Sequence, residues 1–236
     1  MRYMGSKGRH AKDIVPILMA THDQDRWYVE PFVGGGNMLS EVPAKLKWGN
    51  DTAEYAVALL EAVSKGWEPP EVLSEVGYHL IKEDPYGYEP ELVGFAAYCC
   101  SYAGKFWGGF ARGNDTKGNP RNFASEQFRN LKKQAKGLVG AKFTVGSYED
   151  MNIPYGSTVY CDPPYANTTG YKGGFDHEAF WFWCDGLVVG RGCKVFVSEY
   201  TAPKHWTKVW EKKVTNSLTK DTGSKTGVEA LFTRVS

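Results

Sequence analysis

Short apolar segments that suit β-strands alternate with amphipathic segments that suit α-helices at both ends of this 236-residue chain. The pattern predicts strands at residues 27–29, 46–48, 142–145, 158–161 and 194–198. It predicts helices at residues 5–19, 37–42, 53–63 and 177–188, and closing strands at 206–214 and 230–235. Such alternation favours a mostly parallel sheet with helices on both faces, so the predicted fold class is α/β.

The charge of the chain is balanced overall but uneven along its length. With 28 Lys and Arg against 27 Asp and Glu there is no global basic signal, so any nucleic-acid surface has to be local. Residues 68–91 are acidic, whereas residues 101–142 are basic, with glycines and aromatic residues interleaved. We therefore predict one α/β domain formed by residues 1–65 and 142–236, interrupted by a mainly helical insert at residues 66–141.

Membrane and secretory signals are not expected here. No apolar run is long enough to span a bilayer, and the first residues lack the apolar stretch of a signal peptide. The five cysteines, at positions 99, 100, 161, 184 and 193, have no C-x-x-C spacing, so neither a zinc site nor a disulfide framework is predicted. The expected location is the cytoplasm, and the sequence suggests no obligatory protein partner.

A triple glycine follows the first predicted strand, in the segment Pro31-Phe32-Val33-Gly34-Gly35-Gly36. Glycines let a backbone approach a ligand that a Cβ would exclude, although a plain tight turn would have the same composition. The dinucleotide fingerprint is incomplete, because its third glycine would fall at Leu39. A cofactor without a pyrophosphate is the better fit.

Asp51 ends the next predicted strand. A carboxylate in this position can accept hydrogen bonds from the ribose hydroxyls of an adenosine. The alternative is a helix N-cap for the helix expected at residues 53–63. Its place one strand after the triple glycine favours the ligand interpretation.

The segment Asp162-Pro163-Pro164-Tyr165 carries the sharpest chemical signal. Two prolines can neither continue a strand ladder nor start a regular helix, so the loop is stiff. The Asp162 carboxylate and the Pro163 carbonyl can accept the two N–H bonds of an amino group on a planar base, and Tyr165 can stack on the ring. The alternative is a rigid turn with a buried tyrosine.

The basic part of the insert predicts a DNA-binding surface. Phosphates attract lysine and arginine, and polar side chains read base edges. The candidate DNA-binding residues are Lys105, Arg112, Lys117 and Arg121. The alternative is a merely solvated face.

Together these motifs resemble the Dam-like adenine-specific DNA methyltransferases, in their alpha order and in the short branch typical of phages. The resemblance rests on Tyr3 to Lys7, Pro31 to Gly36, Asp51 and Asp162 to Tyr165, in this order and spacing. The likeness to the short branch rests on Phe175 to His177 and Val197 to Tyr200. It implies a Rossmann-like S-adenosylmethionine-dependent methyltransferase fold, with a catalytic domain in two parts and residues 66–141 as the target-recognition insert. It also implies a cofactor site made of Tyr3, Lys7, Pro31, Phe32, Gly34, Gly35, Gly36, Asp51 and Asp162.

The resemblance implies methyl transfer from S-adenosyl-L-methionine to the N6 amino group of adenine in double-stranded DNA, with the base flipped out of the helix. The catalytic residues would be Asp162, Pro163, Pro164 and Tyr165, without a metal. Three alternatives stay open: N4 methylation of cytosine, methylation of RNA or a protein amide, and a DNA-binding module without catalysis. A link to a restriction system in a prokaryote or phage is also expected.

Overall fold

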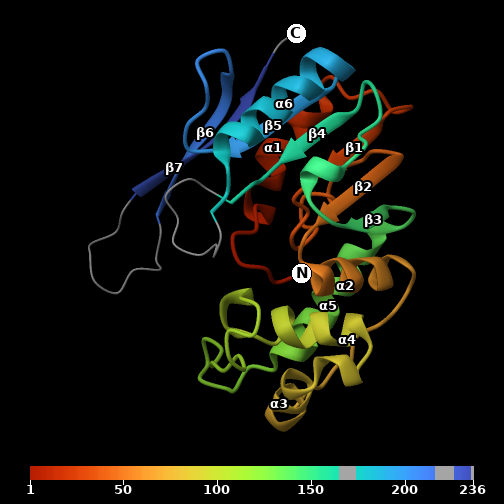
Figure 1. Cartoon of the computed structure of the whole chain (residues 1–236). Helices are drawn as coiled ribbons and strands as arrows, with labels where there is room; N and C mark the ends of the chain where they lie inside the picture. Colours follow the sequence, from red (N-terminus) through yellow and green to blue (C-terminus); the bar gives the residue numbers. More distant parts are fainter. Residues whose placement is uncertain (165–173, 216–225, 235–236) are drawn as a thin grey trace.

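The computed structural model describes residues 1–164, 174–215 and 226–234 of the chain (Figure 1). Seven strands form one sheet in the order β3-β2-β1-β4-β5-β7-β6. The strands are β1 (Trp27–Glu30), β2 (Leu46–Asp51), β3 (Lys142–Val145), β4 (Thr158–Cys161), β5 (Lys194–Glu199), β6 (Thr207–Thr215) and β7 (Thr226–Thr233). Strands β1 to β5 pair in parallel, and β7 pairs antiparallel with both β5 and β6. The predicted α/β fold class is confirmed.

The α-helices are α1 (Ala11–Met19), α2 (Glu54–Ser64), α3 (Glu75–Glu83), α4 (Pro90–Gly94), α5 (Phe123–Leu138) and α6 (His177–Arg191). Alternate residues along each strand face opposite sides of the sheet. Tyr28 of β1 packs in one buried cluster with residues of α1, α2 and α5, whereas its neighbour Val29 packs in a second cluster with α6. Helices therefore cover both faces, as the alternating pattern predicted.

Helix α6 shows how local sequence sets an element's bounds. The side chain of Asp176 accepts a hydrogen bond from the backbone N–H of Ala179 and so caps the first turn. Gly192 ends the helix with a φ of 60°, in the left-handed conformation that glycine adopts without strain. The helix is three residues longer than predicted, because Val189 to Arg191 continue its register up to that glycine.

Two helix predictions need correction. Residues 37–42 form successive turns and no helix, because Asn37 turns its side-chain amide to the carbonyl oxygen of Met1 at 2.9 Å and Pro43 stops the segment. So short a segment cannot recover the cost of helix nucleation. The helix predicted at residues 5–19 starts only at Ala11, after a 3-10 turn over Gly8–His10.

Between β2 and β3 the chain forms the body that lies below the sheet in Figure 1. It holds α3, α4 and a π-helical turn at Phe95–Cys99, followed by a long loop and α5. Although α5 falls inside the predicted insert, its buried residues Leu131 and Leu138 join the same cluster as Leu60 of α2. The last helix of the insert is thus packed into the core of the α/β domain.

Candidate functional site

Three motif-bearing segments meet at one edge of the sheet. β1, β2 and β4 are parallel neighbours, so the glycine segment after β1, Asp51 at the end of β2 and Asp162 after β4 leave the sheet on the same side (Figure 1). The carboxyl ends of parallel strands are where ligands of such sheets bind. Tyr165 lies outside the described residues, so its predicted stacking role stays a prediction.

Lys7 joins the N-terminal segment to the proline loop. Its Nζ lies 3.1 Å from Asp162 Oδ1, and the side chains are 8% and 20% exposed, respectively. Lys7 Nζ also donates to the Gly5 carbonyl oxygen at 3.3 Å. A lysine buried to this degree requires a charge partner, so this cation belongs to the Asp162 site, in contrast to a solvated terminal lysine.

Tyr3 covers the triple glycine. A Cβ on Gly34 would lie 2.9 Å from the Tyr3 ring, and a Cβ on Gly35 would lie 2.7 Å from the Cβ of Tyr3. Gly34 and Gly36 also have positive φ, 47° and 64°. The space freed by Gly34 and Gly35 therefore receives the side chain of Tyr3, and the glycines serve packing and turn geometry at this point.

Asp51 fixes the glycine loop from the neighbouring strand. Its Oδ2 accepts the backbone N–H of Gly34 at 2.8 Å, and its Oδ1 accepts that of Ala53 at 3.0 Å, just before α2. Burial raises the pKa of Asp51, while the two backbone hydrogen bonds act in the opposite direction. Each carboxylate oxygen has a second lone pair, so Asp51 can still accept hydrogen bonds from a ligand. Ala53 is the N-cap residue of α2 and no side chain caps this helix, so the N-cap alternative for Asp51 is wrong.

Glu30 is a buried carboxyl beside this site that the sequence patterns did not single out. It ends β1 directly before Pro31 and accepts the Tyr28 hydroxyl hydrogen bond at 2.8 Å. Burial raises the pKa of Glu30 to about 8, and the Asp162 carboxylate contributes in the same direction. The raised pKa favours the protonated form of Glu30 near pH 7, whereas Asp162 forms the ion pair with Lys7.

Phe32 and Tyr98 take different places around the loop. The Phe32 ring leaves the glycine loop for an aromatic cluster, with the rings of Tyr148, Phe175 and Phe180 within 6 Å of it. Tyr98, from the π-helical turn of the insert, stacks on Tyr3 with ring centroids 5.1 Å apart. Sequence reasoning missed Tyr98 because its contact with Tyr3 depends on how the insert folds back onto the N-terminal segment.

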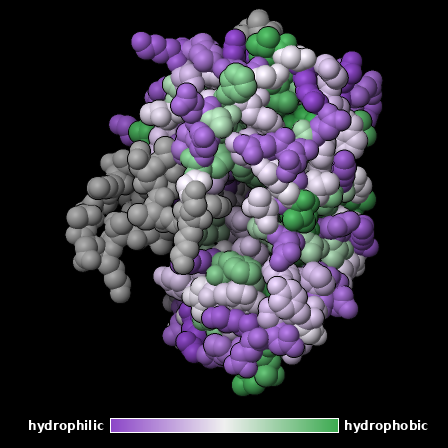
Figure 2. Space-filling model, viewed as in Figure 1, coloured by the Kyte–Doolittle hydropathy of each residue, from purple (hydrophilic) through white to green (hydrophobic). Residues whose placement is uncertain are grey.

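The four candidate DNA-binding residues lie on exposed loops between the π-helical turn and α5. Lys105 sits in a loop closed by the hydrogen bond from Tyr102 N to the Gly109 carbonyl oxygen at 2.8 Å. Lys117 lies in a tight turn whose backbone amides donate to Asp115, and Arg121 follows this turn. Figure 2 shows this lower body as mainly hydrophilic, with an apolar patch at the tip where α3 lies.

Two of these cations are paired with carboxylates of the same insert. Arg112 contacts Glu75 of α3, and Arg121 donates to both carboxylate oxygens of Glu126, at 2.8 and 2.5 Å. Arg121 also lies over the ring of Phe123, 4.4 Å from its centroid. The glutamates hold the guanidinium groups in place, and a phosphate would have to compete with them.

Replacing Glu126 with glutamine is expected to tighten DNA binding by about two- to fivefold. The ion pair between Glu126 and Arg121 then no longer competes with a DNA phosphate for the guanidinium group. Fluorescence anisotropy with a labelled duplex at low salt measures the change, and the gain should shrink at high salt. Glu178→Gln, an exposed change at the start of α6, is the matched control. Weaker DNA binding by Glu126→Gln would show that Glu126 supports the DNA-binding geometry.

Comparison with known proteins finds a family model that matches the segment carrying Tyr3, Lys7, the glycines and Asp51. Residues 3–89 match the D12 class of N6 adenine-specific DNA methyltransferases. The resemblance predicted from the motifs is thereby confirmed for this part of the chain, and the match ends before Asp162.

A curated protein and several solved structures are also similar to this chain. The Type II methyltransferase M.FokI of Planomicrobium okeanokoites is 26% identical over 197 residues, which cover 72% of this chain and 29% of the relative. The chain thus spans less than a third of that relative's length. A putative methyltransferase from Escherichia coli and a tRNA (m1A58) methyltransferase from Aquifex aeolicus both align with a TM-score of 0.39, at 12% and 10% identity. They cover 99% and 98% of this chain, and the alignments span 89% and 71% of those chains.

Within the described residues, no cluster of His, Cys, Asp and Glu could hold a metal ion. In the same part of the chain, no helix has the length and apolar character of a membrane span.

Proposed function

We propose that this protein transfers a methyl group from S-adenosyl-L-methionine to the N6 amino group of adenine in double-stranded DNA. The observation that carries the proposal is the contact between Lys7 and Asp162. It brings the segment that matches the adenine-specific family to the Asp162-Pro163-Pro164 loop, which the matched segment does not include. This contact supports the proposal that the two halves form one site.

The residues at this edge suit S-adenosyl-L-methionine. Asp51 keeps free lone pairs for ribose hydroxyls beside the Gly34 amide. The buried cation of Lys7 provides a positive charge for a carboxylate such as that of the methionine group. No further basic side chain is needed, because the cofactor has no phosphate. When bound, the cofactor supplies an activated methyl group.

The protein's own contribution to the chemistry is to hold and polarise the adenine amino group. Its nitrogen is a poor nucleophile, because the lone pair is delocalised into the ring. The Asp162 carboxylate and the Pro163 carbonyl oxygen would accept its two N–H bonds and so localise the lone pair. Holding the two reactants in line supplies much of the remaining rate enhancement.

The target base has to leave the duplex to reach this loop, because its amino group is stacked and paired inside DNA. We assign Tyr165 the role of stacking on the flipped base. The exposed cations Lys105, Arg112, Lys117 and Arg121 would bind the phosphates around it.

Incubation of the purified protein with DNA and methyl-labelled S-adenosyl-L-methionine tests this function. Hydrolysis of the DNA to nucleosides and mass spectrometry are expected to show N6-methyladenine, and no label in RNA offered in parallel. N4-methylcytosine as the product would replace the proposed substrate. Binding of DNA and cofactor with no methylated nucleoside on any duplex tested would instead favour a module without catalysis.

A further inference from the structure

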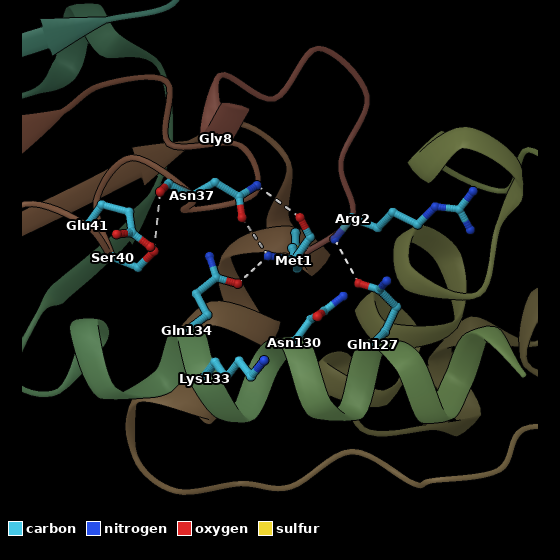
Figure 3. A pocket seen from close by; sticks show the side chains of 10 residues that line it. All are labelled: Met1, Arg2, Gly8, Asn37, Ser40, Glu41, Gln127, Asn130, Lys133 and Gln134. Carbon is cyan, nitrogen blue, oxygen red and sulfur yellow. Dashed lines mark hydrogen bonds between the residues drawn. The ribbon is translucent and has the colours of Figure 1, made fainter. Parts of the chain in front are cut away.

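One face of α5 presents a row of amide side chains toward the N-terminal segment. Gln127, Asn130 and Gln134 are spaced by three and four residues, so they share a helix face. Figure 3 shows them along a cavity of 470 Å³ between α5 and the turns after the glycine loop. Two of the three, Gln127 and Gln134, are buried.

Gln134 contacts the glycine loop, Gly34 to Gly36, called the cofactor loop below because the proposed function places S-adenosyl-L-methionine there. Its Nε2 donates to the Gly35 carbonyl oxygen at 2.8 Å, and its Oε1 accepts a hydrogen bond from the amino group of Met1. The side chain is 8% exposed, so these contacts are shielded from water. A glutamine whose donor and acceptor are both used in this way has one fixed orientation.

The bond from Gln134 fixes one end of a peptide group whose other end is already held. The N–H of Gly36 belongs to the same peptide plane as the Gly35 carbonyl, and it donates to the Val33 carbonyl oxygen at 2.8 Å. Three successive glycines otherwise allow this plane many orientations. With both ends held, the loop has a defined path between Val33 and Asn37.

The body of α5 is anchored to the same region at a second point. A Cβ on Gly137 would lie 1.9 Å from the Ser40 carbonyl oxygen, so the helix backbone touches the turns that follow the loop. The buried Lys47 Nζ donates to the carbonyl oxygens of Leu39 and Gly137, at 3.2 and 2.8 Å. Gln134 therefore reaches Gly35 from a helix that is held against the turns after the glycine loop by a close backbone contact and a hydrogen bond.

We infer that Gln134 is a positioning residue for the cofactor loop, and that the insert, through α5, thus helps to shape the cofactor site. The inference rests on the proposed use of S-adenosyl-L-methionine at this loop. Gln134 acts through the Gly35–Gly36 peptide and touches neither the adenine nor Asp162 in this scheme. Its effect belongs to cofactor affinity.

Gln134→Met tests the role, because methionine fills nearly the same volume and removes the donor. Its dissociation constant for S-adenosyl-L-methionine, measured by calorimetry, is expected to rise about three- to tenfold, because of the two hydrogen bonds that are lost only the one to Gly35 holds the loop. The KM for the cofactor should rise with it, while kcat at saturating cofactor stays within about twofold. Asn130→Ala, on the same helix face but exposed and without a bond to the loop, is the matched control and should leave both constants unchanged.

The outcomes separate this inference from the proposed function. Wild-type cofactor affinity in a folded Gln134→Met variant would overturn the positioning role alone, and so would a fall in kcat without a change in KM. A wild-type protein that binds no S-adenosyl-L-methionine would overturn both proposals. If Gln134→Met does not fold, Gln134→Asn provides the same test, because its shorter amide keeps the polarity but cannot reach Gly35.

Discussion

Asp162→Asn is expected to slow methyl transfer to adenine roughly 100-fold. Asparagine has nearly the same size but replaces one acceptor oxygen with a donor, which would face either an adenine N–H or the Lys7 ammonium. Hydrogen bonds to charged groups contribute about 1.5–3 kcal/mol, and the unpaired donor adds a further cost. The effect should appear in the methyl-transfer step, where the nitrogen lone pair becomes localised.

Single-turnover methylation of a duplex at saturating cofactor isolates that step from cofactor binding. Lys7 is buried, so thermal unfolding of Asp162→Asn has to be measured as well, because breaking a buried pair can destabilise a protein by about 3–5 kcal/mol. Asp150→Asn, an exposed aspartate outside the site, is the control. A folded Asp162→Asn protein that transfers methyl groups at the wild-type rate would remove Asp162 from the mechanism.

The second large effect is expected for Asp51→Asn, which should weaken S-adenosyl-L-methionine binding roughly 100-fold. The new amide would place a donor against the N–H of Gly34 or of Ala53, both of which donate to the carboxylate now. The ribose would also lose a charged acceptor, at a cost of about 1.5–3 kcal/mol for each such bond. The substitution is therefore expected to disturb the conformation of the glycine loop and to remove contacts with the ligand at the same time.

Calorimetry with S-adenosyl-L-methionine and with its demethylated product measures this loss, and NAD serves as a ligand that should not bind wild type. Asp23→Asn, on the exposed loop before β1, is the matched control. Unaltered cofactor affinity in Asp51→Asn would confine Asp51 to its contacts with the backbone N–H groups of Gly34 and Ala53.

Much of the sheet follows from the sequence alone. The strands predicted at 142–145 and 158–161 have the bounds of β3 and β4. β4 is a short buried run that turn-forming residues delimit, whereas β3 is partly exposed and alternates polar with apolar residues. The helix prediction for residues 37–42 was wrong because the apolar residues Met38, Leu39 and Val42 are buried, yet the backbone that carries them forms a series of turns. Periodicity records which residues face the core, and turns can bury the same residues as a helix.

The position of the site was predictable because its motifs follow strands. In a parallel α/β sheet the carboxyl ends of neighbouring strands lie at the same edge, so these motifs are brought together. The contacts of the glycines were not predictable in the same way. A sequence of three glycines shows that space is needed, and only the fold shows that Tyr3 fills it. Likewise, nothing in the composition of α5 distinguishes Gln134 from Asn130, because the difference depends on which of them reaches the Gly35 carbonyl.

The pairing of β1 with β4 also determines when this protein can fold during its synthesis. Tyr28 and Val29 of β1 pair with Thr158 and Val159, so one edge of β1 stays open until residues about 130 positions later have left the ribosome. At about 5–20 residues per second, that interval is on the order of ten seconds. Throughout it the nascent chain exposes an apolar strand edge that can pair with other chains. Expression at a lower growth temperature, or together with added chaperones, should therefore raise the soluble yield of the wild-type protein.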